Sequence, residues 1–171
     1  MNVFYLDTDP VLAAQYHCDK HVVKMIVETT QLLSFALHLQ GLDWNQHGLY
    51  KPNRAHLRHP CTLWVSESRS NFLWAANLAL ALLDEWCFRF SHRSRSEHRS
   101  FDPLSRALKL AFVLPDRKET PPAQAFSEFT HLRDPQNPVL AYRAYYREAK
   151  RHLLEYTLRE KPVWLDDKAA K

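Results

Sequence analysis

Five polar side chains in the N-terminal part of the sequence are spaced so that one helix would carry them on a single narrow stripe. They are His17, His21, Lys24, Glu28 and Gln31. At about 100° per residue, these positions fall within roughly 80° of one another around the helix axis. Apolar residues border the stripe on both sides, whereas a helix that faces solvent shows a wide polar arc. The pattern therefore predicts that the stripe lines an internal cleft.

The residues of this stripe could perform acid–base or nucleophilic chemistry. Lys24 and Glu28 are four residues apart and can form an ion pair, and His21 lies seven residues before Glu28, so both can reach a common ligand. A partly dehydrated carboxylate beside a lysine and histidines has its pKa displaced towards neutrality. The alternative interpretation is a solvent-exposed stripe or a hydrogen-bonded network between helices, because structural ion pairs also shift pKa values.

A metal site is a further interpretation of the same segment. His17 and His21 have the i, i+4 spacing of helical metal ligands, but the sequence HCDKH lacks the arrangement HExxH. Asp19 lies about 200° around the helix from His17, so it cannot join them. A third ligand would have to come from His56 or His59. The favoured interpretation requires no metal and no cofactor, and a divalent ion on His17, His21 and His59 remains the alternative.

Two basic segments and one helix could contact phosphate groups. The first segment precedes an expected helix start, where free backbone N–H groups add to an anion site. The second, residues 91–100, carries several arginines opposed only by Glu97, and such a like-charge block is disfavoured without an anionic partner. The residues expected to contact nucleic acid are Arg54, Arg58, His59, Arg93, Arg95, Arg99 and Arg147.

Aromatic residues supply a candidate base pocket. Tyrosines cluster on one side of the last expected helix and basic residues on the neighbouring side, which is the combination that a single-stranded or extruded base uses. The alternative is ordinary core packing, because aromatic residues at helical spacing usually pack inside. The residues expected to line a substrate pocket are Trp64, Glu67, Asn71 and Tyr142.

The composition indicates which class of protein would carry these side chains and which classes can be excluded. The chain has 171 residues, 46% hydrophobic and 25% charged, which is typical of a single globular domain. Two glycines are too few for a phosphate-binding loop or a Rossmann fingerprint. A formal charge of +4 permits an anionic partner without requiring one. Three cysteines without a CxxC pair argue against a disulfide framework. The apolar runs are too short to predict a membrane span. Acidic residues near the N-terminus argue against a signal peptide, so we expect a cytoplasmic protein.

The sequence predicts a compact all-α domain over residues 1–160, followed by a C-terminal tail over residues 161–171. It should contain three long helices, shorter helices and a proline-rich irregular stretch. The expected elements are an extended segment over 2–6, helices over about 10–40, 61–90, 102–113 and 138–159, and loops over 41–60 and 91–100. Gly41 suits the C-terminal stop of the first helix.

Three segments resemble the pyrimidine-dimer DNA glycosylase (endonuclease V) family over roughly residues 19–90. They are DKHVVKMIVE at 19–28, the segment from Tyr50 to His59-Pro60, and DEWCFRF at 84–90. The opening MNVFYLD with YHCDKHVVKM also looks like small proteins of phages and bacteria. The resemblance implies a small all-α fold, with Glu28 as the catalytic carboxylate and His21 as its neighbour. It further implies an amine that attacks the sugar C1′ and strand cleavage through an imine.

The sequence departs from that family in two ways that affect the chemistry. The best-known members use an amine freed when Met1 is removed before a small residue. Asn2 is too large for efficient removal of Met1, so the nucleophile would be the Met1 amine itself or Lys24. The arginines that flank the glutamate in the family correspond to Val27 and Gln31 here.

Together these patterns predict an enzyme that acts on nucleic acid, most concretely a DNA base-excision glycosylase or lyase. Its expected catalytic residues are Met1, His17, His21, Lys24 and Glu28. One alternative is a metal-assisted hydrolase or transferase acting on nucleotides, and another is a non-enzymatic module that binds nucleic acid. The enzyme interpretation expects Glu28, His21, Lys24, His59 and Glu67 to converge on one open pocket.

Overall fold

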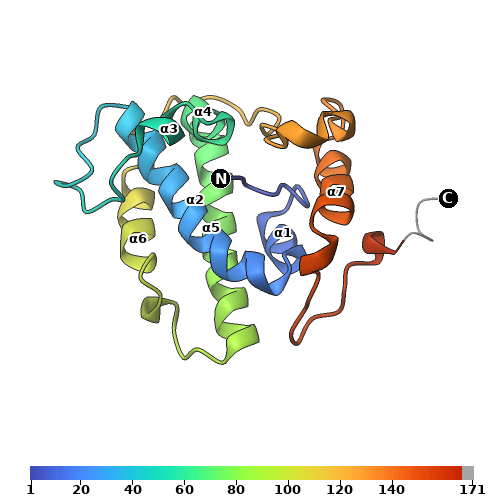
Figure 1. Ribbon diagram of the computed structural model, residues 1–171. Helices are drawn as coiled ribbons and strands as arrows, with labels where there is room; N and C mark the ends of the chain where they lie inside the picture. Colours follow the sequence, from blue (N-terminus) through green and yellow to red (C-terminus); the bar gives the residue numbers. More distant parts are fainter. Residues whose placement is uncertain (167–171) are drawn as a thin grey trace.

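The computed structural model describes residues 1–166, and all regular structure in that part of the chain is helical (Figure 1). The α-helices are α1 Pro10–Tyr16, α2 Asp19–Leu39, α3 Arg54–Leu57, α4 Pro60–Glu67, α5 Arg69–Phe90, α6 Phe101–Lys109 and α7 Pro138–Ala149. Short 3-10 turns occupy Arg95–Glu97, Ala111–Val113, Ser127–Leu132, Arg151–Leu153 and Val163–Leu165. The predicted all-α class is therefore confirmed, with α2, α5 and α7 as the long helices and an irregular proline-rich stretch before α7.

Helices α2 and α5 pack along each other at the centre of the molecule, with α1 against α5, α4 against both, and α6 on α2 (Figure 1). Their shared core is rich in leucine and alanine, and each fully buried leucine contributes about 1.5–3 kcal/mol. Within residues 1–166, α2 alone has the length and hydropathy of a membrane-crossing helix, but 61% of its most apolar window is buried inside the fold. Gly41, at φ +92°, follows its C-terminal end.

The N-terminal segment Asn2–Leu6 runs through the interior between the central helices and α7 (Figure 1). All five of its residues are buried, with at most 6% exposed. The Asn2 Oδ1 atom accepts hydrogen bonds from the Tyr142 hydroxyl and the Val3 N–H, and the Asn2 amide donates to the Ala125 carbonyl at 3.1 Å. The segment is therefore held by the core, and it fixes the position of the chain's first residue.

The prediction of a single helix over 10–40 is wrong at one point. The backbone is extended at His17 and Cys18, and this break divides the segment into α1 and α2. Arg89 accounts for the break. Its guanidinium donates to the carbonyl oxygens of Gln15 and His17 at 2.9 and 2.8 Å, so these acceptors at the end of α1 are satisfied without a further helical turn. His17 consequently leaves the stripe that it was predicted to begin.

The predicted helix over 61–90 is likewise divided, into α4 and α5. Ser68 is extended, with φ −149° and ψ 153°, and its hydroxyl oxygen accepts a hydrogen bond from the Asn71 N–H at 3.0 Å. That is an N-cap, which stabilises the start of α5. The predicted helix over 102–113 is also shorter than expected, since α6 ends at Lys109 and a 3-10 turn follows.

The predicted last helix, 138–159, ends as α7 at Ala149. The residues beyond it bond to the start of α2 instead of continuing the helix. The Asp19 N–H donates to the Glu155 carbonyl at 2.9 Å, and the Asp19 carboxylate accepts from the N–H and hydroxyl of Thr157. These bonds satisfy groups at the N-terminus of α2, which explains why the helical pattern does not continue to residue 159.

Of the predicted tail over 161–171, residues 161–166 are described and residues 167–171 lie outside the described part. The described part packs onto the domain through Trp164. Its ring lies 5.8 Å from the ring of Tyr16 and 5.3 Å from the guanidinium of Arg143. Arg147 donates a hydrogen bond to the Trp164 carbonyl at 3.0 Å.

Candidate functional site

A polar cavity of about 300 Å³ lies where the N-terminal segment, α2, the start of α4 and the end of α7 meet. It is lined by Met1, Asn2, Phe4, His21, Lys24, Glu28, His59, Ala125, Tyr145 and Lys150. The structure thus brings together four of the five predicted catalytic residues and one predicted phosphate-contacting residue. We call this space the N-terminal cavity.

One face of the cavity is the middle of α2. His21, Lys24 and Glu28 all line the space, as the spacing of the stripe predicts. The Lys24 Nζ atom lies 3.1 Å from the Glu28 Oε1 atom, and the two side chains are 65% and 16% exposed. The Lys24 amine is therefore well solvated and the Glu28 carboxyl group mostly sheltered at the edge of the cavity.

Met1, which carries the α-amino group, also lines the cavity. The positive charge of this amine contributes to the lowered pKa of His59 and opposes the burial that raises the pKa of Cys61, so it lies within electrostatic reach of both. The buried hydrogen bonds of Asn2 prevent the first residue from moving away. An amine held in a cavity beside a carboxylate is the arrangement that nucleophilic catalysis by an amine requires.

His21 is a neutral imidazole that is hydrogen-bonded to Tyr146. The Tyr146 hydroxyl oxygen accepts from the Cys18 N–H at 3.0 Å, and the same hydroxyl bonds to His21 Nδ1 at 2.7 Å. When the hydroxyl donates in this bond, the imidazole proton resides on Nε2. Burial lowers the pKa of His21 to about 3, and the charges of His17 and Lys150 act in the same direction. His21 can therefore orient an oxygen atom near neutral pH, but it does not carry a positive charge.

The backbone of Phe4 is strained where it borders the cavity. Its φ is +41°, which a bulky L-residue rarely adopts and which costs on the order of 1–3 kcal/mol. Two contacts hold it there. The Phe4 N–H bonds to the Asn2 side chain, and the Phe4 ring stacks on the ring of His21 with centroids 4.4 Å apart. The strained residue thereby braces the histidine against the end of α7.

His59 lies on the opposite side of the cavity, as the N-cap of α4. Its Nδ1 atom accepts a hydrogen bond from the Cys61 N–H at 3.2 Å. Burial lowers the pKa of this imidazole, and the nearby N-terminal amine lowers it further. His59 is therefore a neutral group whose capping bond fixes its orientation, and it does not supply the positive charge predicted for it.

Sequence reasoning did not assign Lys150 to the site, although it placed this residue on the basic side of the last helix. Lys150 ends α7, and its Nζ atom lies 5.1 Å from the centroid of the Tyr145 ring. Both residues line the cavity. The signal that would have found them is tertiary, because the end of α7 is brought to α2 by bonds from Tyr146 to Cys18 and His21, which lie far away in the sequence.

His17 lies behind the cavity and is not among its lining residues. Its Nδ1 atom bonds to the Ala13 carbonyl at 2.7 Å, its Nε2 atom has no partner, and burial lowers its pKa to about 4. Across residues 1–166, no group of three or more His, Cys, Asp or Glu side chains could hold a metal ion. The geometry therefore gives no support to a metal on His17, His21 and His59.

The residues predicted to line a substrate pocket lie elsewhere. Asn71 and Tyr142 are fully buried, and their side chains bond to protein groups, Asn71 to Trp64 and Thr120. The Trp64 indole donates to the Thr120 carbonyl. Trp64 and Glu67 border a separate hollow of about 560 Å³. The expected convergence of Glu67 with Glu28 does not occur, because Glu67 does not line the N-terminal cavity.

Most of the predicted phosphate-contacting arginines lie away from the cavity. Arg54 and Arg58, beside α3, are exposed, as are Arg93 and Arg99 in the loop after α5. Arg95 forms an ion pair with Asp84. The structure does not gather these groups around the N-terminal cavity, so any contact they make with a ligand would be peripheral to it.

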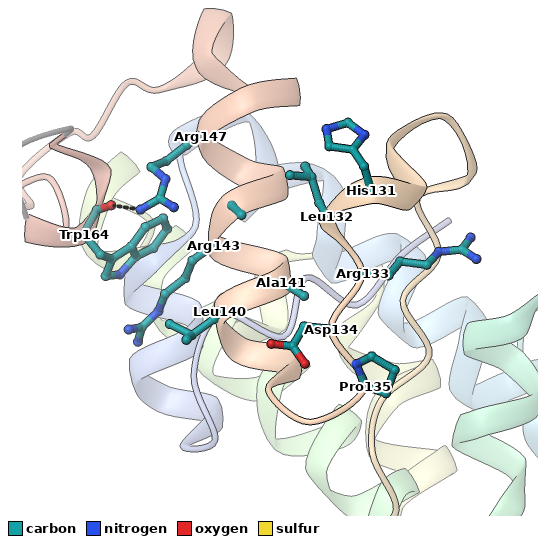
Figure 2. A pocket seen from close by; sticks show the side chains of 11 residues that line it. His131, Leu132, Arg133, Asp134, Pro135, Leu140, Ala141, Arg143, Arg147 and Trp164 are labelled. Carbon is teal, nitrogen blue, oxygen red and sulfur yellow. Dashed lines mark hydrogen bonds between the residues drawn. The ribbon is translucent and has the colours of Figure 1, made fainter. Parts of the chain in front are cut away.

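A larger hollow of about 810 Å³ lies between α7 and the turn Ser127–Leu132 (Figure 2). Figure 2 shows Arg143 and Arg147 extending from α7 beside Trp164, with Arg133 on the far side. Arg143 is already paired with Asp7 at 2.9 Å, and Arg147 donates to the Trp164 carbonyl. The bond from Arg147 ties the C-terminal turn to the domain, and both guanidinium groups are already engaged by protein groups.

Comparison with known proteins does not supply a function. No protein-family model matches the sequence, and neither the curated proteins nor the solved structures contain a match. The functional argument therefore depends on the geometry of the N-terminal cavity.

Proposed function

We propose that the protein is a DNA glycosylase or lyase that attacks a sugar C1′ atom with the α-amino group of Met1, assisted by Glu28. One observation carries this proposal. The first residue of the chain is held by buried neighbours in the same cavity as a sheltered carboxylate and a neutral histidine donor. The resemblance of residues 19–28 to the endonuclease V family agrees with this choice of carboxylate.

The two predicted nucleophiles, Met1 and Lys24, both line the cavity with Glu28, and the Met1 amine is the better of the two. An amine attacks only when it is neutral, and an α-amino group in a short peptide is more acidic than a lysine side chain by roughly 2.5 pKa units. Lys24 is additionally engaged by the Glu28 carboxylate at 3.1 Å. The Met1 amine is therefore the more available of the two.

The cavity residues account for each step of such a reaction. The neutral Met1 nitrogen forms a bond to C1′, and the base leaves with the electron pair of the glycosidic bond and takes up a proton. At an abasic site, water is the leaving group instead. Loss of the nitrogen-bound proton and opening of the sugar ring give an imine. Glu28 stabilises the positive charge that develops at C1′, and the His21 Nε2–H can donate to a sugar oxygen.

Borohydride trapping on an oligonucleotide with one abasic site tests this proposal. Reduction of the imine should give a covalent protein–DNA adduct, and peptide mass analysis should place it on Met1. A chain that carries an extra Gly-Ser before Met1 should lose the adduct by at least about 100-fold, because the amine is displaced. Glu28→Gln should reduce its formation by about 10²–10⁴-fold.

Lys20→Arg is the matched control, because Lys20 lies on α2 outside the cavity and should leave trapping unchanged. An adduct on Lys24 would replace the proposed nucleophile. The absence of any adduct, together with DNA binding that survives Glu28→Gln and falls with salt, would indicate a binding module instead.

A further inference from the structure

The charges that line the N-terminal cavity do not balance. Three of its lining residues, Met1, Lys24 and Lys150, carry an amine, against the single carboxylate of Glu28. Glu28 pairs with Lys24. No ion pair joins Lys150 or the Met1 amine to a carboxylate anywhere in residues 1–166.

The remaining polar groups of the cavity do not offset this charge. His21 is buried and His59 is half-buried, and desolvation lowers the pKa of each, so both are neutral near pH 7. The Asn2 side chain is occupied by hydrogen bonds to the core. An excess of cations in a partly dehydrated cavity attracts an anionic ligand.

The position of Lys150 is fixed by α7 and not by a charged partner. Tyr146 bonds to His21 on α2 at 2.7 Å, and Lys150 follows one helical turn later, with its N–H bonded to the Tyr146 carbonyl at 3.1 Å. The same bond that orients His21 therefore holds Lys150 at the cavity. Its Nζ atom lies near the Tyr145 ring, which leaves its N–H groups available to an anion.

We propose that Lys150 binds a phosphate group attached to the reacting sugar, so that the ligand of this cavity is a sugar phosphate, either within a DNA strand or free. The identity of the sugar rests on the proposed function, whereas the binding of phosphate does not. A lysine ammonium is a compact point charge with three donors, which suits this role.

The proposed contact has a consequence for strand cleavage. Once the imine has formed, the C2′–H bond breaks and its proton passes to the Glu28 carboxylate. The electron pair forms the C2′=C3′ double bond, and the C3′–O bond breaks with its electrons leaving on the phosphate. An ammonium beside that phosphate stabilises the charge that develops. Lys150 therefore affects elimination more than imine formation.

The first experiment measures binding of inorganic phosphate by thermal shift and by NMR titration. Wild type should bind phosphate in the millimolar range, and Lys150→Met should weaken binding about tenfold or more, the loss expected for one charge-assisted hydrogen bond. The methionine retains the apolar stem beside Tyr145. Lys20→Met, on the exposed side of α2, should bind as wild type does. Equal binding by wild type and Lys150→Met, or none by wild type, overturns the proposal.

The second experiment compares trapping with cleavage on the abasic oligonucleotide. With the oligonucleotide at a saturating concentration, Lys150→Met should reduce strand cleavage about tenfold more than it reduces formation of the borohydride adduct. Equal loss of both overturns the role in elimination. Phosphate binding through Lys150 without any adduct in wild type would refute the proposed function and leave the anion site standing. Parallel trapping of free deoxyribose 5-phosphate separates the two sources, because a DNA enzyme should prefer the oligonucleotide.

Discussion

His17 and His21 show how burial turns ionisable side chains into neutral ones. Burial lowers the pKa of His17 to about 4 and that of His21 to about 3, from an ordinary value of 6.5. Phe4 covers both rings, with its own ring centroid 5.9 Å from that of His17 and 4.4 Å from that of His21. These two histidines therefore hydrogen-bond as neutral groups, and protonating either one opposes folding.

This burial predicts that the free energy of unfolding falls as the pH drops below about 6.5. Above that pH both the folded and the unfolded histidines are neutral, and the full stability is present. Below it the unfolded chain binds more protons, so stability decreases by roughly 1.4 kcal/mol per pH unit for each histidine until the folded pKa is reached. Urea unfolding between pH 7 and 5 measures the slope.

The variant His17→Leu should lose about half of that slope between pH 6 and 5, because one of the two buried titrating groups is gone. His152→Leu is the matched control, since His152 is exposed and its replacement leaves both buried rings in place. An unchanged slope in His17→Leu would contradict the assignment of this pH dependence to buried His17.

At the scale of the elements, Arg89 joins three helices. Its side chain is fully buried on α5, where it pairs with Glu85 at 2.9 Å and with Asp19 of α2 at 3.1 Å. It also donates to the carbonyls of Gln15 and His17, at the end of α1. One guanidinium thus holds the junction of α1 and α2 in place, and this junction sets where α2 begins.

Removing this guanidinium should strongly destabilise the protein. Arg89→Met leaves a buried carboxylate and two carbonyls short of donors, and we expect a loss of about 3–5 kcal/mol in the free energy of unfolding. Arg95→Met removes the more exposed pair with Asp84 and should cost at most about 1 kcal/mol. Chemical denaturation of the two variants measures the difference, and similar losses would refute the special role of Arg89.

The helix boundaries show what local sequence can and cannot predict. The spacing of His21, Lys24 and Glu28 placed three cavity residues on one face of α2, because helical periodicity is a local property. The break before α2 was missed, since its cause is Arg89, about 70 residues later. Ser68 is a residue type that favours the N-cap position, but apolar residues on both sides of it predicted one continuous helix.

At the scale of the whole molecule, the C-terminal turn is part of the domain and closes it against α1 and α7. Trp164 contacts the ring of Tyr16 and lies 6.2 Å from that of Tyr146, the tyrosine that orients His21. Residues 161–166 of the predicted tail therefore pack against the helices of the domain. The stability of the cavity's far wall depends in part on this docking.

Trp164→Ala should reduce the free energy of unfolding by roughly 2 kcal/mol, less than the 3–5 kcal/mol of a fully buried aromatic residue because the ring is half-buried. Val163→Ala, at a neighbouring position that is 77% exposed, should cost less than about 0.5 kcal/mol. Thermal and urea unfolding of both variants measure these changes. A neutral Trp164→Ala would show that the turn is not part of the stable core.

The site itself was predictable only in part, for a reason that is physical. The sequence could pair side chains a few residues apart, but Met1, Glu28 and Lys150 meet through contacts between distant parts of the chain. The bonds from Asn2 to Ala125 and Tyr142 span 123 and 140 residues. Nothing local to residue 2 or residue 150 indicates that they share a cavity.

The burial of Asn2–Leu6 also determines how late in its synthesis the protein can complete its fold. The partners of Asn2 are Ala125 and Tyr142, so the earliest residues to leave the ribosome must wait for nearly the whole chain before they can settle. Contacts of such long sequence separation form slowly. A nascent or truncated product that ends before residue 142 would therefore leave residues 2–6 unanchored and the N-terminal cavity unassembled.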